Sequence, residues 1–471
     1  MESMLQFLQM RQEVALIAAF LLMFTADLFI PDNRKKLLHP IACILLVVQA
    51  LVAIKPYEVT LFGGMYHSSE IASVVKTILS FGMLIVFLQS TEWLDREDTK
   101  HKTGEFYILS LSTLIGMYFM VSAGHFLLFF IGLELATIPM ACLVVFDKYK
   151  GNSAEAGAKF ILYALFSSGI FLYGVSLIYG AVGSLYFEDI MPHLHGCELE
   201  TLALVFVFSG LAFKLSLVPF HLWTPDTYQG APTAVSGMLS AISKGAAAFA
   251  LLMVLFKVFA HMSAQWTEML AIVIVVTITV GNLFAMRQHN MKRFMAYSSV
   301  SQAGYILLAI LGDYSQGTAS LVYYIMVYIV ANLAVFGVIN AIDQKTHGKV
   351  DRNDYRGLYK TNPKLTMVMT LALFSLAGIP PFAGFFSKFM VFSAAFAQGH
   401  HLVVFLALIN TVISLYYYLL VVKAMFVDEN DSPIETLKST VPMRISLILC
   451  LAGIILFGLV SSTYHLFYSL S

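Results

Sequence analysis

The chain has 471 residues, of which 59% are hydrophobic and only 12% are charged, and its mean hydropathy is +0.80. Soluble domains carry about 25% charged residues, so this composition excludes an ordinary water-soluble enzyme. Lys plus Arg and Asp plus Glu both number 28, a balance that gives no indication of nucleic-acid binding. The four cysteines stand at no metal-ligand spacing, which argues against disulfides, zinc and iron–sulfur clusters.

Hydrophobic runs follow one another along the whole chain, and a membrane-spanning helix needs about 20 such residues. The runs lie near 12–31, 37–55, 71–91, 104–122, 125–146, 156–183, 200–230, 232–258, 266–286, 294–312, 317–342, 363–397, 401–427 and 441–467. They are continuous and not alternating, which favours helices over a barrel. We predict an all-α polytopic membrane protein with about 14 transmembrane helices. We expect the first run to be retained as a helix, because no cleavage pattern follows it.

Positively charged residues gather in the segments after helices 1, 3, 5, 9, 11 and 13. These segments hold Arg34, Lys35, Lys36; Arg96, Lys100, Lys102; Lys148, Lys150; Arg287, Lys292, Arg293; Lys345, Lys349, Arg352, Arg356, Lys360, Lys364; and Lys423, Lys438, Arg444. The opposite side holds only Arg11, Lys55, Lys257 and Lys76. The positive-inside rule then predicts that both termini lie outside the cytoplasm.

Four ionisable residues lie deep inside hydrophobic runs: Glu134, Lys214, Lys244 and Lys388. A charge at the centre of a membrane helix costs about 2.5–3.5 kcal/mol on insertion scales. Ion pairs that only hold helices together are the alternative, but one glutamate cannot neutralise three lysines. We therefore predict that these four residues have a function beyond holding the helices together.

Prolines interrupt two of the runs beside these lysines. Pro219 follows Lys214 by five residues, and Pro380 and Pro381 precede Lys388. Proline breaks a helix, and the freed carbonyls are tolerated at membrane depth where they line a hydrated or protein-filled cavity. Broken helices in matching positions indicate inverted repeats. We predict two inverted five-helix repeats, each with a broken helix, over 100–260 (helices 4–8) and 261–430 (helices 9–13), preceded by helices 1–3 over 1–99 and followed by helix 14 over 431–471.

Polar side chains fill the intervals between these charges. Lys159 opens helix 6, His221 and Asp226 lie in the first broken segment, and Tyr297 begins a hydroxyl-rich stretch of helix 10. Together such groups can support chains of water across the plane of the membrane. A single membrane hydroxyl usually bonds its own backbone, however, and His221 fits a satisfied interior histidine as well as a relay.

Four motifs carry a resemblance to a known family. FKLSLVPFHLWTPDTYQGAPT, the lysine 30 residues after Lys214 in AISK, MKRFMAYSSVSQAGY and SLAGIPPFAGFFSKF resemble the antiporter-like membrane subunits of respiratory complex I, the bacterial NADH-quinone oxidoreductase. The motifs lie between about residues 100 and 427, and the length and helix count extend the likeness to the whole chain. Lysine at 388 fits the N and L types of subunit better than the M type. We expect the N type, because no long lateral helix follows helix 14.

The resemblance implies a subunit that couples electron transfer from NADH to quinone to proton movement through Glu134, Lys214, Lys244 and Lys388. In the family, the helix-5 glutamate pairs with the lysine of broken helix 7, and Lys388 matches the output-side residue. Supporting family positions are matched by Lys159, Asp226, Lys292 and Tyr297, with His221 added to this polar network from its place in the break. Several relatives have histidine where this chain has Gln302, so a titrating relay is not expected there.

The chain has no nucleotide fingerprint and no haem or cluster ligands. The resemblance therefore implies a non-redox subunit of a NADH:quinone oxidoreductase, a translocase, with no cofactor or metal of its own and with FMN and iron–sulfur clusters in partner subunits. Expected partners are other antiporter-like and small membrane subunits of complex I, the lipid bilayer, and the quinone used by the complex, but no nucleic acid. The expected location is the bacterial inner or plasma membrane, with both termini on the periplasmic side.

Two other interpretations remain open. A subunit of a multisubunit Na⁺/H⁺ antiporter would share the broken helices and buried lysines but would have no redox partner. A purely structural membrane scaffold is disfavoured by the four charges inside the hydrophobic runs.

Overall fold

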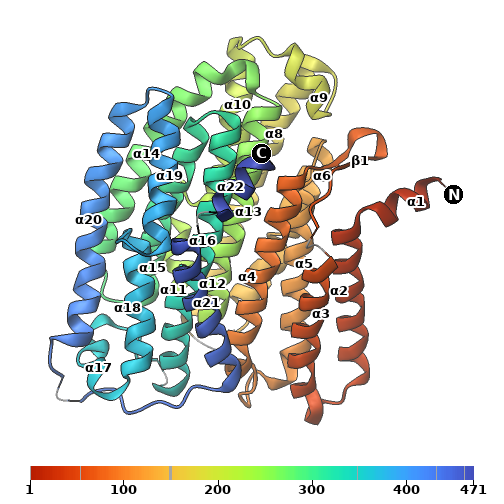
Figure 1. Ribbon diagram of the computed structural model, residues 1–471. Coiled ribbons are helices and arrows are strands. Elements are labelled where there is room, and N and C mark those ends of the chain that lie inside the picture. The colour runs from red at the N-terminus through yellow and green to blue at the C-terminus, as the bar shows by residue number, and fades with distance from the viewer. Residues whose placement is uncertain (1, 53–54, 148–150, 347, 431, 461) are drawn as a thin grey trace.

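The computed structural model describes residues 2–52, 55–147, 151–346, 348–430, 432–460 and 462–471. It is one bundle of helices that run side by side, with both chain termini toward the same end (Figure 1). Within the described ranges, 12 helical segments are long and apolar enough to cross a membrane, and two shorter apolar helices accompany them. The prediction of an all-α polytopic membrane protein is confirmed, whereas the count of 14 helices stays a prediction. Lys148 and Lys150, used above for orientation, lie outside the described residues.

The N-terminal part combines three spans with a hairpin at the end of the bundle where the termini lie (Figure 1). The two strands pair antiparallel, with Val59 opposite Ser68. The elements are α1 (Glu2–Gln9), α2 (Arg11–Phe29), α3 (Leu38–Val52), β1 (Val59–Leu61), β2 (Tyr66–Ser68) and α4 (Glu70–Leu94). Ser69 caps α4, because its side chain accepts a hydrogen bond from the backbone N–H of Ala72.

Interrupted helices dominate the next part of the chain. Its elements are α5 (Thr103–Val121), α6 (Phe126–Leu135), α7 (Ile138–Val144), α8 (Gly151–Val182), α9 (Phe187–Ile190), α10 (Glu198–Leu215), α11 (Trp223–Gly230), α12 (Thr233–Met238) and α13 (Lys244–Lys257). A π-helical turn over Leu239–Ser243 joins α12 to α13. Such turns inside α-helices are frequent at functional sites.

The remaining part carries the longest helix, α16, whose 33 residues correspond to about 50 Å of helix. Its elements are α14 (Ser263–Met286), α15 (Met291–Leu307), α16 (Tyr314–Thr346), α17 (Leu358–Thr361), α18 (Pro363–Ala377), α19 (Ala383–Ala397), α20 (His401–Phe426), α21 (Val441–Leu459) and α22 (Ser462–Ser469). Asn290 caps α15 by accepting hydrogen bonds from the backbone N–H groups of Lys292 and Arg293.

Burial divides the spans into an inner and an outer set. In the apolar 18-residue stretches of the spans Thr233–Lys257 and Met291–Leu311, 94% of the residues are buried, and in that of Tyr314–Thr346 all of them are. The outer spans, such as Arg11–Phe29 and Gly151–Val182, are buried by only about a third and present apolar side chains outward. The polar residues of helix 8 and helix 10 therefore lie on the spans that lipid cannot reach.

Both predicted helix breaks are present. The first separates α10 from α11 and the second separates α18 from α19. Each first half ends at a residue in the left-handed region, Ser216 with φ of 61° and Gly378 with φ of 87°. The two halves of the chain thus contain corresponding interruptions, while the inverted repeats and the four-region division stay predictions.

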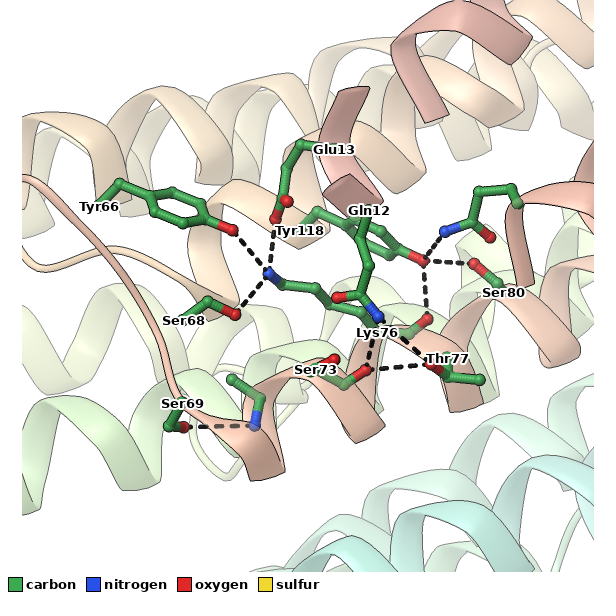
Figure 2. Close-up of polar contacts among 12 residues, drawn as sticks. Gln12, Glu13, Tyr66, Ser68, Ser69, Ser73, Lys76, Thr77, Ser80 and Tyr118 are labelled. Atoms are coloured by element: carbon green, nitrogen blue, oxygen red, sulfur yellow. Dashed lines mark hydrogen bonds and ion pairs between the residues drawn. The ribbon is translucent and has the colours of Figure 1, made fainter. Parts of the chain in front are cut away.

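An ion pair that the sequence analysis missed joins the first and third spans. Lys76 lies inside α4 and is 0% exposed, and its Nζ is 2.6 Å from Oε1 of Glu13, which is 1% exposed. The same Nζ donates to the hydroxyls of Tyr66 at 3.1 Å and Ser68 at 3.0 Å (Figure 2). The sequence analysis counted Lys76 only as a cation of the side opposite the positively charged segments and did not predict this burial, which depends on Glu13 from another helix and on the hairpin.

The contacts around Lys76 connect four elements. Glu13 comes from α2, Tyr66 and Ser68 from β2, and Lys76 from α4. Nearby, Tyr118 of α5 donates to the carbonyl oxygen of Lys76 at 2.9 Å (Figure 2). A buried ion pair with these extra hydrogen bonds fixes how the hairpin and the first span lie on α4.

Lys76→Met should lower the thermal unfolding midpoint of the purified protein clearly, because it leaves the Glu13 carboxylate buried without its cation. Breaking a buried pair costs about 3–5 kcal/mol, whereas replacing both partners by apolar residues is often neutral. The double variant Glu13→Leu/Lys76→Met should therefore regain most of the midpoint. Lys100→Met is the matched control, since its pair with Glu97 is exposed and such pairs contribute about 0–1 kcal/mol. An equal decrease of the unfolding midpoint in Lys76→Met and Lys100→Met would show that the buried pair does not stabilise the fold more than an exposed pair does.

Candidate functional site

Lys214 points at the interruption between α6 and α7. Its amine donates a hydrogen bond to the hydroxyl of Thr137 and lies 3.5 Å from the carbonyl oxygen of Leu133. Lys214 itself is 5% exposed and stands next to the last residue of α10. The amine therefore finds its acceptors where the facing helix has lost part of its own hydrogen bonding.

Glu134 lies between these two acceptors in sequence but does not contact Lys214. Its carboxylate accepts a hydrogen bond from the hydroxyl of Ser168 on α8. None of the ion pairs among the described residues joins Glu134 to Lys214, so the pairing implied by the resemblance is not formed in this arrangement. Glu134 is also only partly buried, in contrast to the three lysines.

A small cavity lies beside Lys214. It has a volume of about 10 Å³ and is lined by residues that include Thr137, Ser167, Ser168 and Lys214. This is space for about one water molecule. A single water there would contact the groups that hold both the amine and the carboxylate.

Several buried polar atoms lie in the chain between Lys214 and Lys244 and have no hydrogen-bond partner among the described residues. They are Ser216 Oγ, His221 Nδ1, Thr224 Oγ1 and Tyr228 OH. Buried polar groups in proteins are normally satisfied by protein or by water. The break between α10 and α11, together with α11 itself, therefore carries unused hydrogen-bonding capacity, and His221 is part of it.

Lys244 is the most deeply buried of the three lysines, with no exposed surface. It is the first residue of α13, directly after the π-helical turn, and its Nζ donates to Ser299 Oγ at 2.8 Å. Ser299 in turn donates to the carbonyl oxygen of Ala296 at 2.7 Å. The amine also lies 5.8 Å from the centre of the Tyr228 ring. Its charge thus faces polar and aromatic groups of the protein and not lipid.

Lys388 lies at the second helix break. Its Nζ donates to the carbonyl oxygen of Ala377, the last residue of α18, at 3.0 Å. The amine also stands 4.7 Å from the centre of the Tyr305 ring, a cation–π distance. The predicted proximity of this lysine to freed backbone carbonyls is therefore present.

A second small cavity of about 10 Å³ lies beside Lys388 and includes Gln302, Tyr324 and Tyr328 in its lining. Tyr328 shares a hydrogen bond of 3.2 Å with Ser240, one helical turn before Lys244. Gln302 accepts from Tyr324 OH at 2.5 Å and donates to Tyr418 OH at 3.2 Å. Hydroxyl and amide groups therefore extend from the surroundings of Lys388 to the turn that carries Lys244.

The helices that carry the three lysines are neighbours. α13 packs against α10 and also against α15 and α16, and α19 packs against α16. The order α10, α13, α16, α19 places Lys244 on the element between those of Lys214 and Lys388. The three lysines thus form a series through the inner helices.

The supporting residues form a separate group at the positively charged end of the bundle. Asp226 Oδ2 is 2.5 Å from Lys159 Nζ, and its Oδ1 is 2.5 Å from Arg293 Nη1. Lys292 donates to the carbonyl oxygen of Ala231 at 2.6 Å. The ring of Tyr297 stacks on Phe284, with centres 5.4 Å apart, and no hydrogen bond among the described residues links it to the lysine series.

A larger polar cavity of about 450 Å³ opens in this region. Its lining includes Arg96, Asp147, Lys292 and Asp343. Asp343 accepts a hydrogen bond from Thr233 Oγ1, at 2.8 Å, on the helix that leads to Lys244. The cavity therefore offers charged and polar groups close to the start of the inner spans.

Sequence reasoning missed three residues that hold the charges in place: Thr137, Ser168 and Arg293. Thr137 and Ser168 are ordinary membrane hydroxyls in sequence, and only their position opposite Lys214 and Glu134 distinguishes them. Arg293 was counted only for orientation, although it follows Lys292 directly and lies in the motif MKRF. The motif MKRF offers Arg293 as a cation that can pair with the carboxylate of Asp226, and this signal could have identified it.

Comparison with known proteins places this geometry in a family. Residues 123–414 match the family described as "NADH:quinone oxidoreductase/Mrp antiporter, TM". The chain belongs to this family. It is 69% identical to the NADH-quinone oxidoreductase subunit N of Phocaeicola vulgatus, over 98% of this chain and 97% of that protein.

Two solved structures share the fold. A chain of respiratory complex I from Thermus thermophilus with bound aureothin is 31% identical, with a TM-score of 0.81 over 95% of this chain and 97% of that chain. A chain of the Mrp complex from Dietzia sp. is 21% identical, with a TM-score of 0.84 over 97% and 94%. Both come from complexes with further membrane subunits, and this likeness supports membrane partner subunits for the present chain. The roles of the individual site residues stay predictions.

Gly378→Ala should displace Lys388 and lower the thermal unfolding midpoint. An added Cβ would lie 3.0 Å from Lys388 Cδ, and the backbone φ of +87° strains any L side chain. Gly399→Ala is the matched control, because it has φ of +84° and nothing within 4 Å. Left-handed backbone strain costs about 1–2 kcal/mol at either site. A larger decrease of the unfolding midpoint in Gly378→Ala than in Gly399→Ala therefore reports the contact with Lys388. Equal shifts in the two midpoints would contradict the contact.

Proposed function

We propose that this chain is a proton-translocating membrane subunit of a NADH-quinone oxidoreductase. The observation that carries the proposal is the series of three buried lysines, two of them at helix interruptions and the third directly after a π-helical turn. Its high identity to a protein named NADH-quinone oxidoreductase subunit N supports the assignment to this enzyme. The proposal includes a bacterial inner membrane location with both termini outside the cytoplasm.

In this function, Lys214 and Glu134 form the adjustable part of the site. Burial favours a neutral amine, and a nearby carboxylate favours the protonated one. Each group has a second partner in the structure: Thr137 for the amine and Ser168 for the carboxylate. The carboxylate can therefore leave or approach the amine without either group losing all of its hydrogen bonds.

Lys244 and Lys388 would receive the proton in turn. The polar atoms that follow Lys214 in the chain, unpartnered among the described residues, would carry the proton to Lys244, and Ser240, Tyr328 and the cavity beside Lys388 would carry it onward. The large polar cavity at the positively charged end would supply protons from the cytoplasm, and Lys388 would hold the proton last before it leaves on the other side.

Electron transfer would take place in partner subunits. The chain contributes proton-holding side chains, while FMN and iron–sulfur clusters of partner subunits would carry the electrons from NADH to quinone. Other antiporter-like and small membrane subunits would connect the two activities. The chain would thus act as a translocase component with no redox centre of its own.

The second candidate function is a subunit of a multisubunit cation/proton antiporter. The observation that favours it is the fold shared with a chain of an Mrp complex, at a TM-score of 0.84. That likeness concerns the fold alone at 21% identity. Affinity purification discriminates the two: co-purification of NADH-oxidising subunits supports the oxidoreductase, and co-purification of small antiporter subunits alone supports the antiporter.

Lys214→Arg, Lys244→Arg and Lys388→Arg should each keep the complex assembled but reduce NADH-driven proton uptake by inverted membrane vesicles. Arginine retains the positive charge but does not release its proton in a protein. We expect a loss of roughly twofold or more, measured with a pH-sensitive dye and normalised to electron transfer. Lys345→Arg is the control, because its pair with Glu92 is partly exposed and lies outside the series. Unchanged proton uptake in all three variants would reject the proposed path.

Thr137→Val should impair proton uptake, since it removes the hydroxyl that accepts a hydrogen bond from the Lys214 amine. The amine then has only the carbonyl of Leu133 and the carboxylate as partners, and it retains its proton more strongly. Thr113→Val is the control, because the Thr113 hydroxyl also donates to the carbonyl four residues earlier but contacts no lysine among the described residues. Wild-type proton uptake in the Thr137 variant, with assembly confirmed, would remove Thr137 from the mechanism.

A further inference from the structure

A groove of about 500 Å³ lies at the end of the bundle opposite the termini. The first turns of α18 and α21 and the segment 436–439 form its walls. Three cationic side chains line it: Lys364, Lys438 and Arg444. The apolar part of the lining includes Leu365, Val368, Leu447 and Ile448. The groove is remote from the lysine series and takes no part in the function proposed above.

The three cations have no counter-charge within the part of the chain that the structure describes. No ion pair or side-chain hydrogen bond involves Lys364, Lys438 or Arg444, and no acidic residue lines the groove. Other lysines at the same end of the bundle are paired: Lys345 with Glu92, Lys360 with Glu429 and Lys423 with Asp428. The groove therefore collects positive charge that the chain neutralises elsewhere.

The position of the segment that carries Lys438 is fixed. Asn362 is 4% exposed, and its Nδ2 donates to the carbonyl oxygen of Glu435 at 2.9 Å. Its Oδ1 accepts a hydrogen bond from the backbone N–H of Leu437 at 2.7 Å. One buried amide thus holds the backbone of the segment that carries Lys438 against the start of α18.

The groove continues onto the lipid-facing surface. Leu447 is 5% exposed and forms its floor, whereas Ile448 and Ile445 are 66% and 45% exposed on the same helix. α21 is one of the membrane-spanning helices, and Arg444 stands in its first turn. The cations therefore lie at the boundary between membrane and water, with an apolar wall leading from them into the membrane. The N-terminal ends of α18 and α21 add partial positive charge at the same place.

We propose that this groove binds an anionic phospholipid of the surrounding bilayer. The phosphate group would lie among Lys364, Lys438 and Arg444, and an acyl chain would follow Leu447 and Ile448. Basic pockets between membrane helices on the cytoplasmic side bind acidic lipid headgroups in this way. A soluble anion would match the cations but not the apolar wall, and a neutral lipid would match the wall but not the cations.

The test is native mass spectrometry of the purified, delipidated assembly that contains the chain, titrated with phosphatidylglycerol and with phosphatidylcholine of the same acyl chains. The wild type should prefer phosphatidylglycerol, and Lys364→Gln/Lys438→Gln/Arg444→Gln should bind it on the order of 100-fold more weakly, because each cation contributes about fivefold. The matched control is Arg34→Gln/Lys349→Gln/Arg356→Gln, which removes three exposed cations predicted on the same side but outside the groove. It should leave the preference unchanged.

Two further measurements separate the sources of the anion. Ile448→Ser should weaken phosphatidylglycerol binding, and millimolar inorganic phosphate should not displace the lipid from the wild type. Full displacement by inorganic phosphate would overturn the lipid assignment and leave an anion site. If the groove variant and the control variant lost phosphatidylglycerol binding equally, the preference would depend on the net charge of the protein and not on the groove. Absence of any phosphatidylglycerol preference in the wild type would show that a partner subunit or nothing at all occupies the groove.

Discussion

An amine buried in a membrane protein needs hydrogen-bond acceptors, and the backbone carbonyls of an intact helix already bond its own N–H groups. The acceptors of the three lysines are therefore carbonyls at helix interruptions or side-chain hydroxyls. Lys214 reaches the gap between α6 and α7, and Lys388 reaches the last carbonyl of α18. Lys244 follows a π-helical turn and bonds Ser299. Helix interruptions and hydroxyl side chains together thus supply the hydrogen bonds that the three buried amines need.

The same interruptions leave room beside the amines. The cavities at Lys214 and Lys388 each have a volume of about 10 Å³, and each lies next to a broken helix. A fully packed apolar interior would hold a lysine with no route for its proton, and an open channel would let protons cross without control. Sites with space for about one water molecule, separated by hydroxyls on the most buried helices, meet both requirements of the proposed function.

The sequence was sufficient for the all-α membrane fold, both helix breaks and the burial of the three lysines, because long hydrophobic runs, prolines and isolated charges are local signals. It was insufficient for Lys76, whose burial depends on the hairpin that folds back over α4 and on Glu13 from another span. It also could not show that Glu134 bonds Ser168 and not Lys214. Helix packing decides which of several neighbouring hydroxyls forms a hydrogen bond with a given charged side chain. That packing cannot be predicted from one sequence.

Glu134 is less buried than the three lysines. This difference fits the proposed function, in which the carboxylate responds to partner subunits and the lysines hold the proton. Lys214, Lys244 and Lys388 are at most 5% exposed, so nothing outside the chain reaches them directly. Glu134 is only partly buried, and its carboxylate accepts a hydrogen bond from Ser168 on α8. A partner subunit that changes the surroundings of this carboxylate can therefore shift its contact from Ser168 toward Lys214 without opening the interior. In the proposed function, a redox event in another subunit would then act on the interior lysines through this one carboxylate.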